Sequence, residues 1–359
     1  MFDFAASYAV RVESYMVETN RANGRPTDLP IRELERVFPM QIVVTDYTFP
    51  DLGIEESLIT ASGFQLNAWK EKKSAAELPA LVAEADAVIT QFAPVNADVI
   101  RSMKRAKVIV RYGIGVDNVD LAVAKECGIP VCNVPDYCID EVADHTLAFL
   151  LGTTRQVATS SNFVKGGRWG LATPIDRIQV LKNMTVGVVG FGRIGREVVS
   201  RLRAFKCRIL VSDPVAAVAD ITAAEAVPAS LNDLLAQSDA ITLHCPSTAE
   251  TRGMLNSESL ALTKPGVIVI NLARGDLIDP AALTASLQSG HVSAAALDVF
   301  NPEPIPADHP ILKMDNVIVA SHIASVSVTA VRKLRETAAN LAVMALKGQP
   351  LPNVVNGVV

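Results

Sequence analysis

The sequence lacks the features that place a chain in a membrane or on a nucleic acid. It has no apolar stretch approaching the roughly 18 uninterrupted residues of a transmembrane helix, and its N-terminus has no basic segment followed by an apolar one. Lysine and arginine do not gather in any one segment, and the formal net charge is −5. We therefore expect a cytoplasmic protein with neither a membrane nor a nucleic acid as a partner.

Cysteine is also scarce. There are five cysteines, an odd number, and no C-x-x-C pair, which favours reduced and mostly buried thiols. No group of His, Cys and Asp residues has the spacing of metal ligands, so no metal site is expected. Half of the 359 residues are hydrophobic and a fifth are charged, which is typical of a globular chain long enough for two domains.

A glycine-rich loop in the middle of the chain is the most informative pattern that is present. An apolar run at 186–189 precedes it, and an amphipathic helical pattern at 194–202 follows it. A G-x-G-x-x-G loop between a strand and a helix binds the pyrophosphate of a dinucleotide, because the glycines permit a tight turn and the helix N-terminus attracts phosphate. The loop positions expected to contact the cofactor are Gly190, Gly192, Arg193, Ile194 and Gly195.

An aspartate follows the loop at an informative distance. Asp213 ends the next expected strand, 23 residues after Gly190 (213 − 190). An acid about 20 residues beyond such a loop hydrogen-bonds the ribose hydroxyls, and its charge repels a 2′-phosphate. The cofactor predicted is therefore NAD rather than NADP. The alternative interpretation is that Asp213 only begins a turn before Pro214.

Over 180 residues precede the loop, so another unit comes first. Residues 1–40 follow no long pattern and are expected to form an N-terminal extension, with Met40 as an alternative natural start. From residue 41 short strands alternate with helical patterns, which predicts a small parallel sheet of flavodoxin-like type. Its expected strands are 42–45, 87–90, 108–111 and 131–133, and its expected helices lie near 53–61, 75–84, 95–103 and 119–127.

The second unit is expected to be a doubly wound sheet of six strands. A helix capped by Asp140 and running from 141 to about 155 is expected to connect the two units. A last amphipathic pattern at 326–347 is expected to return to the first unit, because chain termini often lie close together. The expected strands of the second unit are 186–189, 208–212, 240–244, 267–271, 294–297 and 317–320.

Three polar residues follow strand ends of the second unit: Arg274, Glu303 and His322. Ligands of open α/β sheets bind at the carboxyl ends of the strands. Arginine grips a carboxylate with two hydrogen bonds, and histidine exchanges a proton near neutral pH. A carboxylate beside the histidine orients it and favours its charged form. This set of side chains suits the oxidation of a 2-hydroxy acid.

Seven segments read, in chain order, VRYGIGVDNVDL, NVPDYCIDEVADHT, VGVVGFGRIG, LHCPST, NLARGDLID, ALDVFNPEP and SHIAS. As a set, spanning 110–325, they resemble the D-isomer-specific 2-hydroxyacid dehydrogenase family. Within it they are most similar to bacterial members of the C-terminal-binding-protein-like and phosphoglycerate-dehydrogenase-like branch. The resemblance implies an α/β fold in which a Rossmann NAD-binding domain, 141–323, is inserted into a flavodoxin-like substrate domain, 41–140 and 324–359. It also implies a homodimer, with 141–182 as the arm at the interface.

The resemblance also implies roles for single residues. Arg274 would bind the substrate carboxylate and polarise the carbonyl group, His322 would be the acid and base, and Glu303 would be the partner of His322. Asp298 would hold the nicotinamide carboxamide. Further cofactor contacts are implied for Thr146, Cys245, Pro246, Thr251, Leu272 and Ala273, and substrate contacts for Arg111, Ile114 and Gly115.

The substrate itself is left open. Arg111 matches a basic position of phosphoglycerate-type and C-terminal-binding-protein-type members, although a structural role for it is equally consistent with the sequence. The loop at 90–94 should face the cleft, and it has no Arg or Lys. Because a phosphorylated substrate needs more than one nearby cation, this loop argues against 3-phosphoglycerate.

Two functions follow from these residues. The first is an NAD-dependent oxidoreductase that transfers a hydride between nicotinamide and a D-2-hydroxy acid or its 2-oxo acid. The alternative is an NAD(H)-sensing interaction protein of the C-terminal-binding-protein type. The intact set of Arg274, Glu303 and His322 favours the enzyme.

Overall fold

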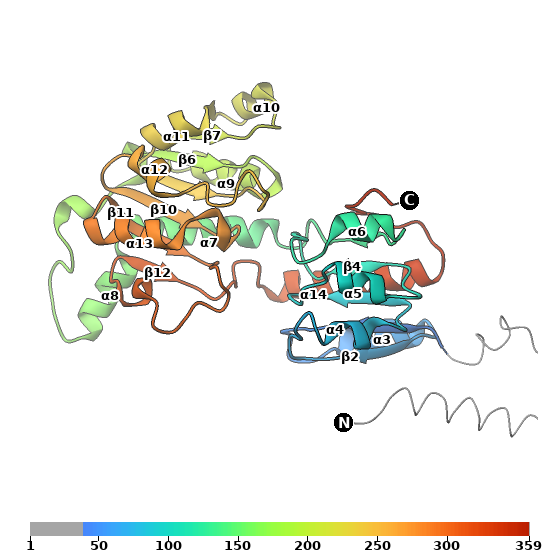
Figure 1. The fold of residues 1–359 in the computed structure, drawn as a ribbon. Helices are drawn as coiled ribbons and strands as arrows, with labels where there is room; N and C mark the ends of the chain where they lie inside the picture. The colour runs from blue at the N-terminus through green and yellow to red at the C-terminus, as the bar shows by residue number, and fades with distance from the viewer. Residues whose placement is uncertain (1–38, 359) are drawn as a thin grey trace, which may run out of the picture.

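The computed structural model describes residues 39–358, so the expected extension at 1–40 lies almost wholly outside the described residues. The chain forms two lobes, each built on one parallel sheet (Figure 1). The α/β class is confirmed. The first sheet has the order β2-β1-β3-β4-β5, which is the flavodoxin-like order. Its strands are β1 (Gln41–Val44), β2 (Gln65–Ala68), β3 (Ala87–Thr90), β4 (Ile109–Arg111) and β5 (Val131–Cys132).

The central strands of the first sheet are apolar and almost fully buried, as expected for a parallel sheet covered by helices on both faces. Its helices are α3 (Gly53–Ala61), α4 (Leu78–Val82), α5 (Ala97–Ser102) and α6 (Leu121–Glu126). Asn96 and Asp120 cap α5 and α6 with their side chains. The four predicted strands are present, and β2 is a fifth strand that the sequence pattern does not reveal.

The second sheet has the order β12-β11-β10-β9-β6-β7-β8, so strands are added on one side of β6 up to β8 and on its other side from β9 onward. This is the order of a Rossmann sheet with an added edge strand. All six predicted strands are present, and the two-residue β8 is a seventh. The strands are β6 (Thr185–Val189), β7 (Arg208–Ser212), β8 (Val227–Pro228), β9 (Ala240–Leu243), β10 (Val267–Asn271), β11 (Val292–Leu297) and β12 (Val317–Val319).

Short helices and turns link these strands. The glycine-rich loop leads into α9 (Arg193–Arg203), and Asp279 caps α13 (Pro280–Ser289) by accepting two backbone N–H groups. The other helices of this lobe are α10 (Val218–Ala223), α11 (Leu231–Gln237) and α12 (Ser257–Ala261). Four 3-10 turns complete it: η1 (Ile175–Arg177), η2 (Leu181–Asn183), η3 (Gly275–Leu277) and η4 (Pro310–Lys313).

The connecting helix α7 (Ile139–Thr154) begins earlier than predicted. Its N-cap is Cys138, and Asp140 lies in the first turn, so the prediction that Asp140 caps this helix was wrong. The Asp140 carboxylate instead accepts a 2.6 Å hydrogen bond from Arg201 of α9. A further helix, α8 (Val157–Lys165), follows α7 and was not predicted. None of the helices in residues 39–358 combines the length and apolar character that crossing a membrane requires.

The last helix, α14 (Val328–Leu346), returns to the first sheet, as the sequence predicts (Figure 1). Its side chains Leu334, Ala338 and Leu341 share a core with residues of β1, β3 and β4. The chain therefore passes between the lobes twice, once before α7 and once before α14. The carboxyl ends of both sheets contribute to a single cleft of about 940 Å³.

Candidate active site

The glycine-rich loop has the geometry of a dinucleotide site. Gly190 has a φ of +97°, and a Cβ there would stand 2.7 Å from the His244 backbone. A Cβ at Gly195 would overlap the Gly190 carbonyl oxygen, so this glycine lets α9 pack tightly against the loop. A Cβ at Gly192 would meet open space, and among residues 39–358 no side chain caps the N-terminus of α9. The first N–H groups of α9, with Arg193 and Ile194 in its first turn, are therefore free to bind an anion.

Asp213 lies at the end of β7, directly beside this loop. Its carboxylate accepts hydrogen bonds from the backbone N–H groups of Phe191, Val215 and Ala216, at 2.6, 2.8 and 2.9 Å. Partial burial alone would raise the pKa of Asp213, but these three donors outweigh it and hold the pKa below its usual value. Asp213 is therefore a fixed negative charge next to the phosphate-binding turn.

Most of the other predicted cofactor residues lie in loops that follow strands of the second sheet. Thr251 donates to the Pro246 carbonyl at 2.7 Å, which closes the loop after β9, and the Cys245 sulfur lies 3.7 Å from that of Met254. Burial raises the pKa of Cys245 to about 11, so its thiol stays neutral. Leu272 and Ala273 follow β10, and Thr146 is buried in α7, where its hydroxyl bonds the Val142 carbonyl.

His322 and Glu303 form a hydrogen-bonded pair in the cleft. His322 Nδ1 lies 2.9 Å from Glu303 Oε2, and Glu303 Oε1 accepts the Phe300 N–H at 2.8 Å. Burial would raise the pKa of Glu303, but the bond to His322 and its charge, with the Phe300 donor, keep this pKa below the usual value. With Nδ1 bound in this way, Nε2 of His322 is the nitrogen left for a substrate.

A second carboxylate fixes the backbone around His322. Asp298 accepts the N–H groups of Ile323 and Ala324, both at 2.8 Å, and its carbonyl accepts the N–H of His322. His322 itself has a φ of +58°, a left-handed conformation that needs such support in a residue other than glycine. Asp298 also lines the cleft, with 1% of its surface exposed, and its contact with the nicotinamide stays a prediction.

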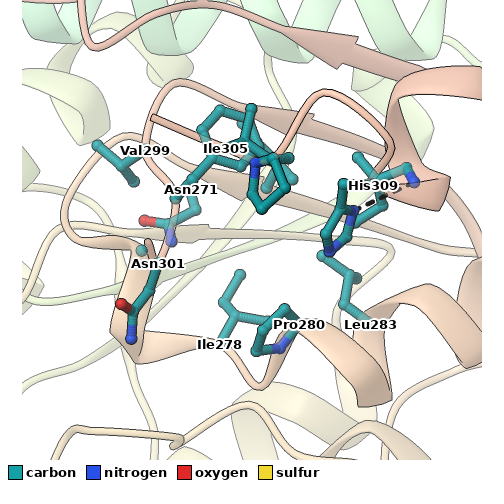
Figure 2. A pocket seen from close by; sticks show the side chains of 13 residues that line it. Asn271, Ile278, Pro280, Leu283, Val299, Asn301, Ile305 and His309 are labelled. Atoms are coloured by element: carbon teal, nitrogen blue, oxygen red, sulfur yellow. Dashed lines mark hydrogen bonds between the residues drawn. The ribbon is translucent and has the colours of Figure 1, made fainter. Parts of the chain in front are cut away.

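The loop that carries Glu303 is held by packing. Figure 2 shows Ile305 and His309 of this loop beside Ile278, Pro280 and Leu283, around a small cavity of about 30 Å³. That volume is about the share of one water molecule in the liquid, so the cavity is too small for a substrate. The apolar packing instead anchors the loop, and so fixes Glu303 toward His322.

Arg274 reaches across from the second lobe to the first. Its Nε donates to Asp117 at 2.9 Å and its Nη1 to the Ala273 carbonyl at 2.7 Å. Burial raises the pKa of Asp117, but Arg274 outweighs this, so the pKa lies below the usual value. A Cβ at Gly115 would overlap Nη2 of Arg274, so a larger residue there would displace this guanidinium. The remaining N–H groups of Arg274 are left for a substrate carboxylate.

The loop at 113–115 is held by hydrogen bonds from two residues that follow β5. Val134 N–H donates to the Gly113 carbonyl at 2.9 Å, and the Asn133 side chain to the Ile114 carbonyl at 2.7 Å. Within residues 39–358, the N–H groups of Ile114 and Gly115 have no protein acceptor. They are therefore available to an anionic ligand, as the resemblance implies.

Arg111 is buried behind this loop, with 8% of its surface exposed. Its Nε has no hydrogen-bond partner among the described residues. Its guanidinium lies over the ring of Phe92, which also contacts the ring of His322 edge-on. Burial, and then repulsion from Arg274, lower the pKa of Arg111. Arg111, Arg274, Asp298, Glu303 and His322 all line the cleft, whereas the residues of the glycine loop do not.

The cleft also contains residues that the sequence analysis did not single out. Asp46 accepts the N–H groups of Gln91 and Phe92, at 3.0 and 2.7 Å, and so holds the loop after β3. Asp117 pairs with Arg274, as described above. Two lysines of the segment after β2, Lys70 and Lys72, line the outer part of the cleft. Asp46 and Lys70 follow the ends of parallel strands, which is the signal that could have identified them.

Comparison with known proteins decides the family. A sequence model described as "D-isomer specific 2-hydroxyacid dehydrogenase, NAD binding domain" matches residues 147–324. The chain is 34% identical over 300 residues to a glyoxylate reductase of Korarchaeum cryptofilum, covering 82% of this chain and 90% of that protein.

The chain belongs to the D-isomer-specific 2-hydroxyacid dehydrogenase family.

Other members of this dehydrogenase family agree in sequence and in fold. A D-3-phosphoglycerate dehydrogenase of Mycobacterium leprae is 37% identical over 305 residues, which cover 84% of this chain and 57% of that protein. This chain thus spans little more than half of the length of that relative. The crystal structure of a D-lactate dehydrogenase of Aquifex aeolicus, with NAD and lactic acid, has 28% identity and a TM-score of 0.78, covering 86% of this chain and 96% of that one.

The matching family model is described as an NAD-binding domain, and the glycine loop fits NAD. The open space at Gly192 and the uncapped start of α9 provide a place for a pyrophosphate. The carboxylate of Asp213 would accept hydrogen bonds from the ribose hydroxyls of NAD, and its negative charge would oppose a 2′-phosphate. Gly190, Gly192, Gly195 and Asp213 would therefore hold the adenosine diphosphate part of NAD.

Proposed function

We propose that this chain is an NAD-dependent D-2-hydroxyacid dehydrogenase that interconverts a D-2-hydroxy acid and its 2-oxo acid. The observation that carries the proposal is the convergence of Arg274 and the His322–Glu303 pair on one cleft. Relatives named glyoxylate reductase, D-lactate dehydrogenase and D-3-phosphoglycerate dehydrogenase support the same class of reaction. The catalytic residues proposed are Arg274, Glu303 and His322.

The residues of the chain bind the substrate and move its proton. Arg274, with the free N–H groups of Ile114 and Gly115, holds the carboxylate and places C2 beside His322. When bound, the nicotinamide supplies or accepts the hydride at C2. In reduction, Nε2 of His322 gives a proton to the carbonyl oxygen, and in oxidation it takes the hydroxyl proton back. Glu303 stabilises the charged form of the imidazole.

An NAD(H)-sensing interaction protein would need different features in this site. A scaffold gated by NAD(H) needs the dinucleotide loop but has no use for an aligned acid–base pair. The pair at 2.9 Å, held by the Phe300 N–H and by Asp298, therefore favours catalysis.

We further propose that the working form is a cytoplasmic homodimer, with 41–140 and 324–359 as the substrate domain and 141–323 as the NAD-binding domain. The segment from α8 to η1 leaves the body of the second lobe (Figure 1). It exposes large apolar side chains, including Trp169 at 90%, Ile175 at 75% and Leu171 at 64%. Apolar patches of this kind are typical of protein interfaces. The five free cysteines support a reducing compartment.

The test is NADH oxidation with a panel of 2-oxo acids: glyoxylate, pyruvate, hydroxypyruvate, longer 2-oxo acids and 3-phosphohydroxypyruvate. We expect turnover of at least one of them and D stereochemistry in the product. Capture of a protein partner that depends on NADH, together with no turnover of any acid, would support the sensing alternative instead.

A further inference from the structure

Two arginines lie against the backbone of the loop at 113–115. A Cβ at Gly113 would overlap Nη1 of Arg111. A Cβ at Gly115 would overlap Nη2 of Arg274 in the same way. The two guanidinium groups repel each other, and this repulsion adds to burial in lowering the pKa of Arg111. An anion close to both arginines would offset the repulsion.

Asp117 supplies that anion from the turn that follows the loop. Its Oδ1 accepts a 2.9 Å hydrogen bond from Nε of Arg274 and lies 2.9 Å from the position of a Cβ at Gly115. Partial burial alone would raise the pKa of Asp117, but the charge and hydrogen bond of Arg274, with the charge of Arg111, hold this pKa below the usual value. Asp117 is therefore ionised at neutral pH and attracts both arginines.

The ion pair determines which edge of Arg274 is left for a substrate. Asp117 accepts the Nε N–H, and the Ala273 carbonyl accepts one N–H of Nη1. Among the described residues Nη2 has no hydrogen-bond acceptor. A carboxylate bound end-on by Nη1 and Nη2 would lie next to the loop, where the N–H groups of Ile114 and Gly115 are also free.

The pair also joins the two lobes. Asp117 follows β4 of the first sheet, and Arg274 follows β10 of the second. The side chain of Arg274 is 23% exposed, and a long side chain with such freedom can adopt many rotamers. The hydrogen bond to the opposite lobe restricts these rotamers to those that reach across the cleft. A side chain that is already ordered binds an anion at a lower entropic cost.

We propose that Asp117 is a positioning residue, which holds the guanidinium of Arg274 in the orientation that binds the substrate carboxylate. The inference rests on the proposed function and adds a residue that acts through Arg274. The same carboxylate could instead have a purely electrostatic effect, since an anion beside two arginines weakens their attraction for a second anion. The two roles predict opposite effects on substrate binding when Asp117 is replaced.

The test compares Asp117→Ala with Asp117→Asn in NADH-dependent turnover of the best 2-oxo acid. In Asp117→Ala, kcat/KM should fall at least about tenfold, mainly through a higher KM for the acid, because misplacing a binding group costs up to about 100-fold. Asp117→Asn keeps an oxygen acceptor for Nε of Arg274, so its kcat/KM should stay within about threefold of the wild type. The KM for NADH should change in neither variant.

Asp120→Ala is the matched control. Asp120 lies in the same turn, and its carboxylate caps α6 by accepting the Val123 N–H at 3.0 Å. Loss of this cap should lower the midpoint of urea denaturation but leave kcat/KM for the acid nearly unchanged. Affinity for oxamate in the presence of NADH gives a second readout that needs no turnover. This affinity should fall in Asp117→Ala and be nearly unchanged in Asp117→Asn and Asp120→Ala.

The outcomes separate this inference from the proposed function. A lower KM for the acid in both Asp117 variants would indicate the electrostatic role and overturn the positioning role. Equal falls in kcat/KM in the two variants, or wild-type kcat/KM in Asp117→Ala, would also overturn it and leave the proposed function intact. If the wild type turns over no acid, the proposed function fails and the oxamate titration still decides the role of Asp117. A wild type that does not bind oxamate either counts against both.

Discussion

The position of His322 depends on two carboxylates that act in different ways. Asp298 fixes the backbone turn through N–H groups, whereas Glu303 binds the imidazole ring itself. Glu303 therefore influences the charge of His322 directly. Since the pKa of Glu303 is lowered, this residue is ionised at neutral pH and throughout the range in which a histidine titrates.

We expect Glu303→Gln to keep the site assembled but to weaken catalysis. The amide can still bond Nδ1 of His322, but it no longer stabilises the positive imidazolium. For reduction, which needs a proton from His322, kcat should fall about 100-fold. Glu258→Gln, on the exposed surface, is the control. A kcat of Glu303→Gln equal to that of the wild type would be inconsistent with this role.

Single residues also show what the sequence could predict. Arg274, Glu303 and His322 were identified because each follows a strand end in a known family motif. Asp117 lies within the segment VRYGIGVDNVDL, but its bond to Arg274 joins positions 157 residues apart and has no local signal. Lys70 and Lys72 were missed because the strand before them was not recognised.

At the scale of elements, long apolar strands and long helices were predicted well, and short exposed ones were not. β2 has partly polar, partly exposed residues, and β8 has two exposed residues, so neither gives an apolar run. The cap of α7 was misassigned for a tertiary reason. Asp140 is a good capping residue, but Arg201 of a neighbouring helix binds its carboxylate.

A buried polar network joins three elements of the first lobe. Arg335 of α14 donates to both oxygens of Glu55 in α3, with a shortest distance of 2.7 Å, and Tyr112, after β4, donates to Glu55 at 3.1 Å. Glu55 is fully buried. Breaking one side of such a pair leaves an uncompensated charge in the core, so the network holds α14 to the lobe.

We therefore expect Glu55→Gln to destabilise the first lobe by about 3 kcal/mol, since Arg335 would lose its main anion while keeping Asp51. Urea denaturation should show this as a lower midpoint. Glu56→Gln, at the exposed neighbouring position, should change the unfolding free energy by less than about 0.5 kcal/mol. Equal midpoints for the two variants would rule out a stabilising role for the network.

At the scale of the whole molecule, the cleft depends on two lobes that the chain joins twice. Two polar contacts join the segments where the chain passes between the lobes. Ser327, before α14, donates to Glu141 of α7 at 2.7 Å. Lys333 of α14 lies 2.9 Å from Asp136, which precedes α7. Arg274 and Asp117 link the opposite walls of the cleft. The sequence predicts both lobes from their patterns, but such contacts between lobes only appear in three dimensions.

The exposed apolar side chains of the segment from α8 to η1 predict that the protein is a dimer. Wild-type protein should elute as a dimer in size-exclusion chromatography with light scattering. Trp169→Asp should shift it toward monomer, because a charge would be buried at the interface. NADH binding should remain, as the glycine loop is unchanged. A wild-type protein that is monomeric at every concentration would refute the proposed dimer.

We propose that His322 transfers the proton in a reaction of NAD with a 2-hydroxy or 2-oxo acid. The decisive measurement is the rate of NADH oxidation by wild-type and His322→Ala protein, on the best 2-oxo acid of the panel, alongside NADH affinity by fluorescence titration. We expect a rate at least about 1,000-fold lower in the variant, with NADH affinity nearly unchanged. A variant that turns over at the wild-type rate would contradict it.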